Sequence, residues 1–234
     1  PFMAPCFGTI ARIARGNGHT KVLCQIDNVE PHEHHLTDKP FNRYYLHSVD
    51  GFVYMSEQVH SELRAYSDAP ALFSPHPLFE NFGERVERSE ACVRLGLDPA
   101  NRYVLFFGLI RDYKGLDLLL DAWAQLRRAG RTEGRRLIVA GEFYTAREPY
   151  LNRIADNGLQ DEVLLHDRFI PDDDVKYYFS AADFVVQPYK TATQSGVTQI
   201  AYQFCVPMVV TDVGGLSEIV PDGRVGYVCE PTVQ

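Results

Sequence analysis

The chain has 234 residues, of which 45% are hydrophobic and 23% are charged, and its net charge is −8. This composition is typical of a globular protein long enough for one large or two modest α/β units, and the acidic balance argues against non-specific binding to nucleic acid or to membranes through polybasic segments. The five cysteines are widely spaced and form no Cys-x-x-Cys pattern, which predicts reduced thiols and a cytoplasmic location, and no apolar run approaches the roughly 20 residues of a transmembrane helix.

Residues 1–80 have the pattern of an incomplete α/β domain. The chain starts without Met, inside helix-like sequence, and it ends where another helix would normally follow, so we expect a fragment of a longer protein. Ser56 is the predicted N-cap of one helix. In chain order, the predicted elements are a helix over 3–15, a strand over 21–26, a polar loop over 27–35, a helix over 41–49, a strand over 51–55, a helix over 56–66 and a strand over 71–73.

Residues 81–234 repeat the alternation with better definition and predict a second domain. The strands are continuous apolar runs separated by amphipathic helices, which is typical of a doubly wound parallel sheet buried on both faces. We therefore expect an α/β fold whose ligands bind beyond the carboxyl ends of the strands. After a connector with a helix near 87–95, strands are predicted over 102–109, 136–140, 162–165, 184–187 and 208–211, and helices over 116–128, 149–155, 172–181 and 196–204.

Two cations follow the strand over 102–109. Arg111 and Lys114 lie between Gly108 and Gly115, whose backbones can turn tightly. A guanidinium and an ammonium at this edge of a sheet can neutralise a diphosphate, the leaving group of sugar transfer. Taken alone, the two cations are better explained as part of a solvated basic loop, because short motifs are weak evidence for a binding site.

A second polar segment, Gln194-Ser195-Gly196, stands between the strand over 184–187 and the next helix. Free backbone amides at a helix start bind phosphate, although an ordinary N-capped helix would have the same sequence. Gln199, one turn into that helix, is a candidate for hydrogen bonds to ribose hydroxyls, with a surface glutamine as the alternative. The two polar segments can face one ligand if their strands are neighbours.

The loop over 27–35 combines Asp27 and Asn28 with three histidines, His32, His34 and His35. A His-x-His-His run in a loop has no helix to align metal ligands, so we expect no metal site and assign Asp27, Asn28 and His32 to the acceptor side, with a solvated loop as the alternative. The acidic run over 172–174 could hold a divalent cation, but it opens a predicted helix, where capping of backbone amides is the better explanation. The glycine pair at 214–215 allows a ligand to approach closely or simply forms a turn.

The order and spacing of these motifs resemble the family-4-type retaining glycosyltransferases of the GT-B fold, also called group 1 glycosyl transferases. The resemblance covers nearly the whole chain. It implies two Rossmann-like domains facing a cleft, the C-terminal one binding a nucleotide-sugar donor and the N-terminal one, here incomplete, supplying most of the acceptor site. The motifs are Phe107-Gly108 to Lys114-Gly115, Val139 to Gly141, Ala182 to Pro188, Gln199 to Ala201, Pro207 to Glu218, and Gly226 to Val228.

The resemblance also implies roles for donor-site residues. Arg111 and Lys114 would hold the donor diphosphate, although the family's usual arginine stands at the position of Leu109. The family commonly has two glutamates eight residues apart, contacting donor sugar and ribose, and this chain has Thr191 and Gln199 in their places.

Further roles follow from the same resemblance. Residues Gln194, Ser195 and Gly196 would meet the phosphates or the sugar, and the backbone near Ile170 would meet the base. Asp27 stands where relatives often have a histidine, and it would orient the acceptor hydroxyl or the sugar.

The sequence therefore predicts a retaining glycosyltransferase that needs neither a metal ion nor a cofactor. It would move a sugar from a nucleotide-diphosphate sugar to a glycan or lipid-linked acceptor, in the synthesis of glycans or surface polysaccharides. A non-catalytic nucleotide-sugar-binding module is the alternative from another class, because neither Thr191 nor Gln199 is acidic, and a GT-B-fold nucleotide-sugar epimerase is a third. Any peripheral contact with a membrane would be made by the segments that this fragment lacks. An exposed edge of the sheet would favour pairing of two copies into a homodimer. No nucleic-acid partner is expected.

Overall fold

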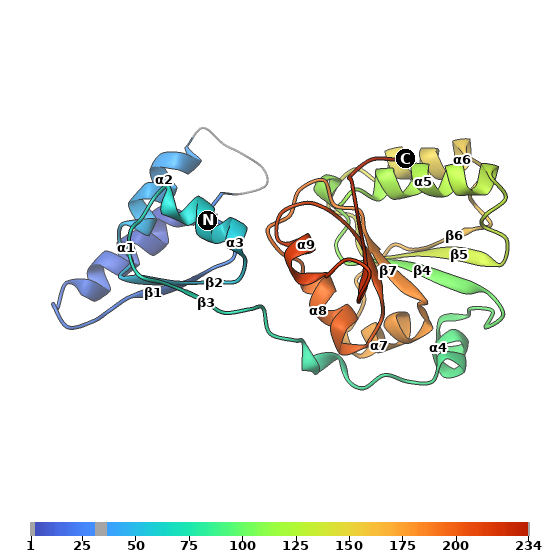
Figure 1. The fold of residues 1–234 in the computed structure, drawn as a ribbon, viewed down its shortest axis with the longest axis horizontal. Helices are drawn as coiled ribbons and strands as arrows, with labels where there is room; N and C mark the ends of the chain where they lie inside the picture. The colour runs from blue at the N-terminus through green and yellow to red at the C-terminus, as the bar shows by residue number, and fades with distance from the viewer. Residues whose placement is uncertain (1–2, 31–36, 234) are drawn as a thin grey trace. The chain divides into compact units, whose positions relative to one another are not determined.

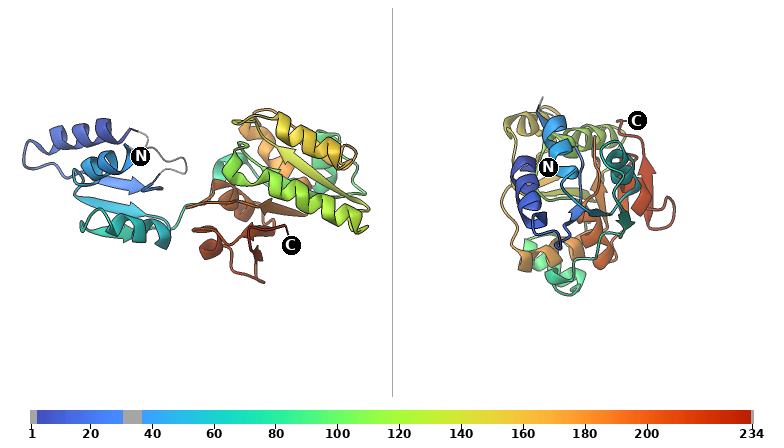
Figure 2. Two further views of the ribbon diagram at one scale, coloured as in Figure 1. Left: turned by 90° about the horizontal axis from the view of Figure 1, so that it is seen from above. Right: turned by 90° about the vertical axis from the view of Figure 1, so that its left-hand side faces the viewer.

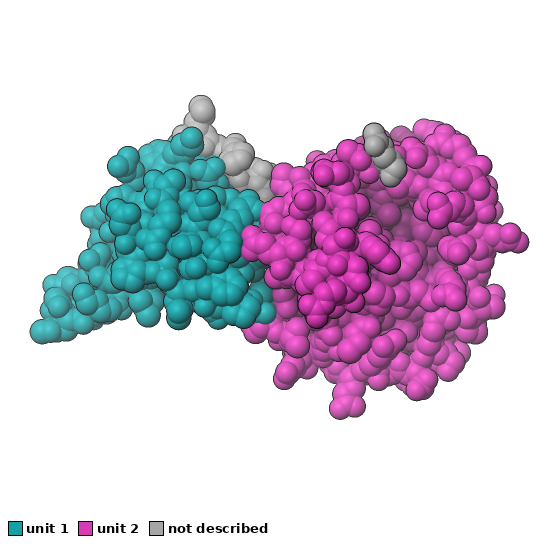
Figure 3. All heavy atoms as spheres, viewed as in Figure 1, with its two compact units in different colours: residues 1–76, 192–194 teal, residues 77–191, 195–234 magenta. Residues whose placement is uncertain are grey.

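The computed structural model describes residues 3–30 and 37–233. The chain forms two compact units, shown in teal and magenta in Figure 3. Unit 1 comprises residues 1–76 with the short segment 192–194, and unit 2 comprises residues 77–191 and 195–234. Each unit has its own parallel sheet (Figure 1), as the alternation of strands and helices predicted. Within the described residues, no helix is long and apolar enough to span a membrane.

Unit 1 is built on a three-stranded parallel sheet with the order β1-β2-β3. The sheet register places Cys24 beside Phe52 and Phe52 beside Ala71. β1 is an edge strand whose side chains alternate between exposed and buried, and Leu23 is 72% exposed. The elements are α1 (Ala4–Arg15), β1 (Leu23–Ile26), α2 (Asp38–Leu46), β2 (Gly51–Tyr54), α3 (Glu57–Arg64) and β3 (Ala71–Phe73).

The core of unit 1 lies between its sheet and helices. The hydroxyl of Ser56 accepts a hydrogen bond from the amide of Val59 at 3.3 Å and caps α3, which confirms the predicted N-cap. Capping fixes where α3 begins, and this start directs the apolar face of the helix to the sheet. The buried cluster contains Cys24, Ile26, Val29, Leu46, Val49, Phe52, Tyr54, Val59 and Leu63.

Unit 2 is built on a six-stranded parallel sheet with the order β6-β5-β4-β7-β8-β9. The chain runs outward from β4 to β6 and then returns to place β7 on the other side of β4. β4 and β7 therefore flank the point where the strand order reverses, and this is where doubly wound sheets bind ligands. The strands are β4 (Arg102–Phe107), β5 (Arg135–Ala140), β6 (Val163–His166), β7 (Phe184–Gln187), β8 (Met208–Thr211) and β9 (Gly226–Cys229).

Helices cover both faces of this sheet. α5 and α6 lie side by side on one face, in Figure 1 and in the left view of Figure 2, and α4, α7 and α8 lie on the other. The helices of unit 2 are α4 (Arg88–Leu95), α5 (Leu116–Arg128), α6 (Glu148–Asp156), α7 (Asp172–Ala181), α8 (Gly196–Gln203) and α9 (Leu216–Ile219), with 3-10 turns η1 (Glu80–Phe82) and η2 (Asp112–Lys114).

Strand β4 is buried on both faces, which explains its continuous apolar sequence. Val104 and Phe106 belong to the cluster under α5 and α6, together with Trp123. Phe107 packs on the opposite face, where its ring lies 5.1 Å from the ring of Phe179 in α7. Consecutive side chains of a strand point to opposite faces, so a strand between two helical layers needs apolar residues at every position.

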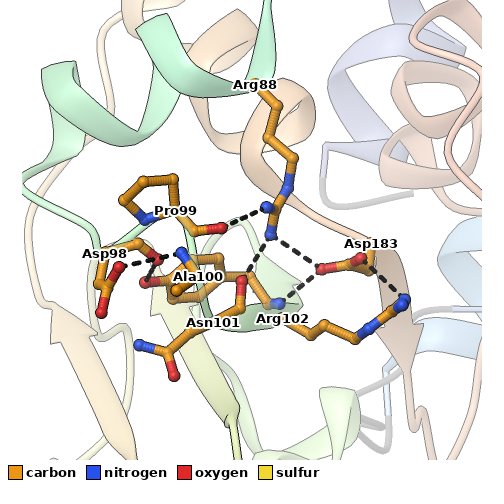
Figure 4. A network of polar contacts seen from close by, with 8 residues as sticks. Arg88, Asp98, Pro99, Ala100, Asn101, Arg102 and Asp183 are labelled. Carbon is orange, nitrogen blue, oxygen red and sulfur yellow. Dashed lines mark hydrogen bonds and ion pairs between the residues drawn. The ribbon is translucent and has the colours of Figure 1, made fainter.

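An ionic network fixes α4 to the amino edge of the same sheet (Figure 4). Arg88 donates hydrogen bonds to the carbonyl oxygens of Pro99 at 2.9 Å and Asn101 at 2.7 Å, and it pairs with Asp183 at 3.2 Å. The Asp183 carboxylate also accepts a hydrogen bond from the amide of Tyr103 at 2.7 Å. The network therefore joins α4 and the start of β4 to Asp183, which lies 80 residues beyond Tyr103 in the sequence.

Two features differ from the sequence predictions. The acidic run over 172–174 forms the first turn of α7, but none of its side chains caps the helix, and Asp174 instead pairs with Arg94 at 3.1 Å. Pro171 occupies the N-cap position, so the carboxylates contribute through the helix dipole rather than through a cap. The second difference is that two short elements, α9 and β9, follow the glycine pair at 214–215; the pair itself forms a turn, which was one of the two predicted alternatives.

Candidate functional site

Two loops meet at the carboxyl ends of β4 and β7. β4 pairs with β7 through Val104 beside Phe184 and Leu105 beside Val185, so the loops that follow these strands are neighbours. The two polar segments can contact one ligand only if their strands are adjacent in the sheet, and they are. The structure therefore brings together the residues around 108–115 and those around 188–190.

The first loop depends on two glycines. Gly108 has a φ of +99°, a conformation that side chains rarely adopt. Gly115 also has a positive φ, and a Cβ at this position would collide with the carbonyl oxygen of Pro188. Glycine at position 115 thus allows the two loops to pack backbone to backbone.

Further contacts join the loops. The amide of Lys190 donates to the carbonyl oxygen of Tyr113 at 2.7 Å, and the rings of Tyr113 and Tyr189 lie edge to face with centroids 6.1 Å apart. The ammonium of Lys190 pairs with Asp117 in α5 at 2.7 Å. Lys190 is therefore a structural cation whose charge is already neutralised.

Lys114 is the second cation of the predicted pair. A Cβ on Gly108 would lie 3.2 Å from the Lys114 Nζ and 3.5 Å from the side chain of Val197, so the ammonium lies beside the first turn of α8. Burial, followed by the nearby charge of Arg111, lowers the pKa of Lys114 to about 8. Within the described residues, no carboxylate pairs with this ammonium. A buried charge without a partner is costly, and an anionic ligand would relieve that cost.

Arg111 lies over the ring of Tyr144, with its guanidinium carbon 5.1 Å from the ring centroid. The neighbouring acid, Asp112, does not neutralise it, because the Asp112 carboxylate accepts hydrogen bonds from Thr145 at 3.0 Å and from Tyr150 at 2.9 Å. Burial, followed by this contact with Asp112, raises the pKa of Tyr150, so its hydroxyl stays a donor. The loop's carboxylate is thus held toward α6, and its two cations keep their charge for a ligand.

The start of α8 has backbone amides that are unpaired within the described residues. Ser195 occupies the N-cap position with extended backbone angles, yet its side chain does not cap the helix. Gly196 begins the helix, and within the described residues neither its amide nor that of Val197 donates a hydrogen bond. Two unpaired amides beside Lys114 make a site for phosphate oxygens.

The other residues predicted for donor binding are placed as follows. Gln199 lies one turn into α8 and is only 5% exposed, so it is not a surface glutamine. Gln194 has both polar atoms of its side chain buried, without a hydrogen-bond partner in the described part of the chain. Thr191 is exposed in the loop after β7. Ile170 is buried where α7 begins, at the carboxyl edge of the sheet and two strands from β4.

The residues predicted for the acceptor side belong to unit 1. Asp27 is exposed and Asn28 is half-buried, and both follow directly after β1. His32 lies outside the described residues, as do His34 and His35. Within the residues described, no group of three histidine, cysteine or acidic side chains could hold a metal ion.

Two residues of this region were not singled out from the sequence. Tyr189 belongs to the second loop, and its ring contacts Tyr113 in the first. His166 ends β6, where its Nδ1 is 2.8 Å from the Tyr178 hydroxyl. Burial lowers the pKa of His166, and Arg168 lowers it further, which favours a neutral ring at neutral pH. Their place in the sequence, at or just beyond a strand's carboxyl end, was the available signal.

A family model described as glycosyl transferases group 1 matches residues 101–234. The chain is 33% identical over 172 residues to the lipopolysaccharide core biosynthesis mannosyltransferase LpsB of Rhizobium meliloti, covering 68% of this chain and 45% of that protein. It is 32% identical over 144 residues to the D-inositol 3-phosphate glycosyltransferase of Pseudarthrobacter chlorophenolicus, covering 61% of this chain and 34% of that protein. The chain thus spans less than half of the length of these relatives.

Solved structures with a similar fold extend over both units. The sucrose-phosphate synthase of Thermosynechococcus elongatus superposes with a TM-score of 0.81 at 20% identity, covering 96% of this chain and 58% of the other. The Anabaena protein Alr3699/HepE in complex with UDP gives a TM-score of 0.80 at 18% identity, covering 98% of this chain and 63% of the other. At such identities the likeness concerns the fold.

Proposed function

Because the chain belongs to the group 1 glycosyl transferase family and has its GT-B-type fold, we propose that it contains the donor-binding part of a retaining glycosyltransferase. The enzyme moves a sugar from a nucleotide-diphosphate sugar to the hydroxyl of a glycan or lipid-linked acceptor. We place this reaction in the cytoplasm and in the assembly of glycans or surface polysaccharides. The named activities of the relatives support the class of reaction, and the donor site of unit 2 supports the class of donor.

One observation carries the proposal: the half-buried ammonium of Lys114 has no counter-ion among the described residues and lies beside amides of α8 that are unpaired in the same part of the chain. In sugar transfer, the bond between the anomeric carbon and the diphosphate oxygen breaks, and negative charge develops on the diphosphate. A preorganised cation and helix amides stabilise this charge more than they stabilise the intact donor, which accelerates the reaction. Arg111 adds a second positive charge, so the chain itself supplies the neutralisation that a metal ion would otherwise give.

The remaining steps are assigned to groups around this centre. The acceptor hydroxyl attacks the anomeric carbon on the face that the diphosphate leaves, and its proton passes to the departing phosphate oxygen. Asp27 orients the acceptor, Gln199 bonds the ribose, and the backbone near Ile170 meets the base. UDP is the first nucleotide to test, because similar structures hold UDP and UDP-glucose.

A binding module without catalysis is the second candidate. It is favoured by Thr191 and Gln199, neutral residues at positions where the family commonly has glutamates. A transferase releases free nucleotide from its sugar donor when an acceptor alcohol is present, whereas a module binds the donor and leaves it intact. Measuring nucleotide release from UDP-glucose and GDP-mannose over time separates the two.

The test of the donor site is a calorimetric titration with UDP, GDP, ADP and CMP. We expect one diphosphate to bind, and the double variant Arg111→Ala/Lys114→Ala to lose that binding. The matched control is Arg128→Ala/Arg131→Ala, which removes two cations near the far end of α5 and should bind as the unaltered protein does. Binding that survives in the first double variant would refute the assignment of these cations.

A further inference from the structure

Tyr189 lies at the centre of the contacts between the two loops. It follows β7 and is only 3% exposed. Its carbonyl oxygen accepts a hydrogen bond from the Thr211 hydroxyl in β8 at 2.6 Å, and its ring contacts that of Tyr113. The backbone and the ring of Tyr189 are therefore both fixed.

The ring of Tyr189 faces the ammonium of Lys114, which lies 5.7 Å from the ring centroid. An aromatic face attracts a cation without neutralising it. A carboxylate in the same place would pair with Lys114 and compete with an incoming diphosphate. The ring thus holds the cation in position and leaves its charge for the ligand.

The hydroxyl of Tyr189 acts on the second half of the site. It lies 3.2 Å from the hydroxyl of Ser195, the residue at the N-cap position of α8. Serine with extended backbone angles at this position usually accepts a hydrogen bond from an amide of the first turn. Here the Ser195 hydroxyl is bonded to Tyr189 instead, and the cap is absent.

We propose that Tyr189 is a positioning residue for the donor diphosphate: its ring holds the Lys114 ammonium, and its hydroxyl keeps Ser195 from capping α8, so that cation and amides both stay available to phosphate oxygens. The inference rests on the proposed function and adds a residue to it. Tyr189 does not touch the reacting atoms in this scheme. It acts by keeping the Lys114 ammonium and the first amides of α8 from pairing with other groups of the protein.

The experiment uses the whole chain and two probes, inorganic pyrophosphate and UDP. Tyr189→Phe keeps the ring and frees Ser195 to cap α8, so affinity for pyrophosphate should fall about three- to tenfold. Removing the competing hydroxyl as well, in Tyr189→Phe/Ser195→Ala, should restore most of that affinity. A purely structural role for the tyrosine hydroxyl predicts no such rescue.

Tyr189→Leu removes the ring, and its readout does not depend on ligand binding. The titration of Lys114 is followed by the ¹³C NMR shift of its side chain in the unliganded protein. The midpoint should move to lower pH in Tyr189→Leu, because the ring no longer stabilises the charged form, and should stay in place in Tyr189→Phe. Tyr103→Phe is the matched control, since Tyr103 is equally buried in unit 2 and its hydroxyl bonds Asp98 at the amino edge of the sheet.

The outcomes separate the two ideas. If neither probe binds the unaltered protein, the proposed donor site fails, while the Lys114 titrations still decide whether Tyr189 holds the cation. If the probes bind and Tyr189→Phe, with or without Ser195→Ala, binds as the unaltered protein does, the proposed donor site stands and the role of the hydroxyl is overturned. An unchanged Lys114 midpoint in Tyr189→Leu overturns the role of the ring.

Discussion

At the scale of single residues, the two cations after β4 differ from ordinary surface cations in their surroundings. Lys190 and Arg127 have carboxylate partners, Asp117 and Glu162. Lys114 instead lies near an aromatic ring, and burial lowers its pKa to about 8. The same residue type therefore serves structure at one position and, in our proposal, ligand binding at another.

The lowered pKa of Lys114 predicts opposite effects of pH on folding and on binding. The unfolded chain keeps this proton up to its usual pKa of about 10.4, so between about 8 and that value the unfolded state binds more protons than the folded one. In that window, the contribution of Lys114 to the free energy of unfolding rises with pH. Diphosphate binding needs the charged ammonium, so affinity should fall through the same window.

The measurement is UDP or pyrophosphate affinity from pH 7 to 10. The affinity of the unaltered protein should decline above pH 8, by up to about tenfold for each pH unit. Lys114→Met should bind roughly tenfold or more weakly at pH 7, because a charge-assisted contact is lost, and its affinity should not decline above pH 8. A decline of equal size in Lys114→Met would assign the titration to another group.

At the scale of elements, the two edges of the unit 2 sheet have separate tasks. Among the described residues, Arg111 and Lys114 in the loops at the carboxyl edge have no ion-pair partner, whereas the amino edge has an ionic network whose charges are paired. There Asp183 bonds Arg88 and the amide of Tyr103, and Arg102 lies 3.5 Å away (Figure 4). Stability and ligand binding should therefore respond to different substitutions.

Asp183→Ala tests this division. The substitution leaves the Tyr103 amide and Arg88 without their acceptor, so the free energy of unfolding should fall by about 2 kcal/mol. Pyrophosphate affinity should stay unchanged, because the network is at the opposite edge from the loops. Denaturant titration and calorimetry measure the two quantities, and Asp173→Ala, which removes an exposed acid from the first turn of α7, is the control with a small expected effect. A parallel loss of affinity would show that the two edges are coupled.

At the scale of the whole molecule, the chain has two hydrophobic cores. One fills unit 1 around Leu46 and Phe52, and the other fills unit 2 around Leu120 and Trp123. Both leucines are fully buried. Units with their own cores unfold as separate cooperative blocks when few contacts link them.

We therefore expect two transitions in differential scanning calorimetry. Leu46→Ala should lower the midpoint temperature of one transition and Leu120→Ala that of the other. Each substitution should reduce the free energy of unfolding of its unit by the roughly 2–5 kcal/mol that a buried leucine contributes. Pyrophosphate at about 100 times its dissociation constant should stabilise only the transition that Leu120→Ala lowers, by about 2.7 kcal/mol. A single transition that both variants shift would indicate one cooperative unit.

The sequence by itself determined the elements, the parallel α/β class and the family. Strand and helix periodicities are local, so β7, β8 and α5 begin and end where the apolar pattern indicated. The glycines and cations after β4 also marked one carboxyl edge as the place for a ligand. α9 went unpredicted because its four residues make only about one helical turn. β9 went unpredicted because none of its four residues is buried, so it lacks the continuous buried run of the central strands.

Only the tertiary structure decided which of these residues act together. Strand order placed β7 beside β4, although about 80 residues separate them in the sequence, and no local pattern encodes such a neighbour. The same packing left Lys114 half-buried, with no carboxylate partner in the described part of the chain, turned Ser195 from its helix toward Tyr189, and set Pro188 against Gly115. Burial and pairing depend on atoms from distant segments, and for that physical reason the sequence could name the loops but not the contact that joins them.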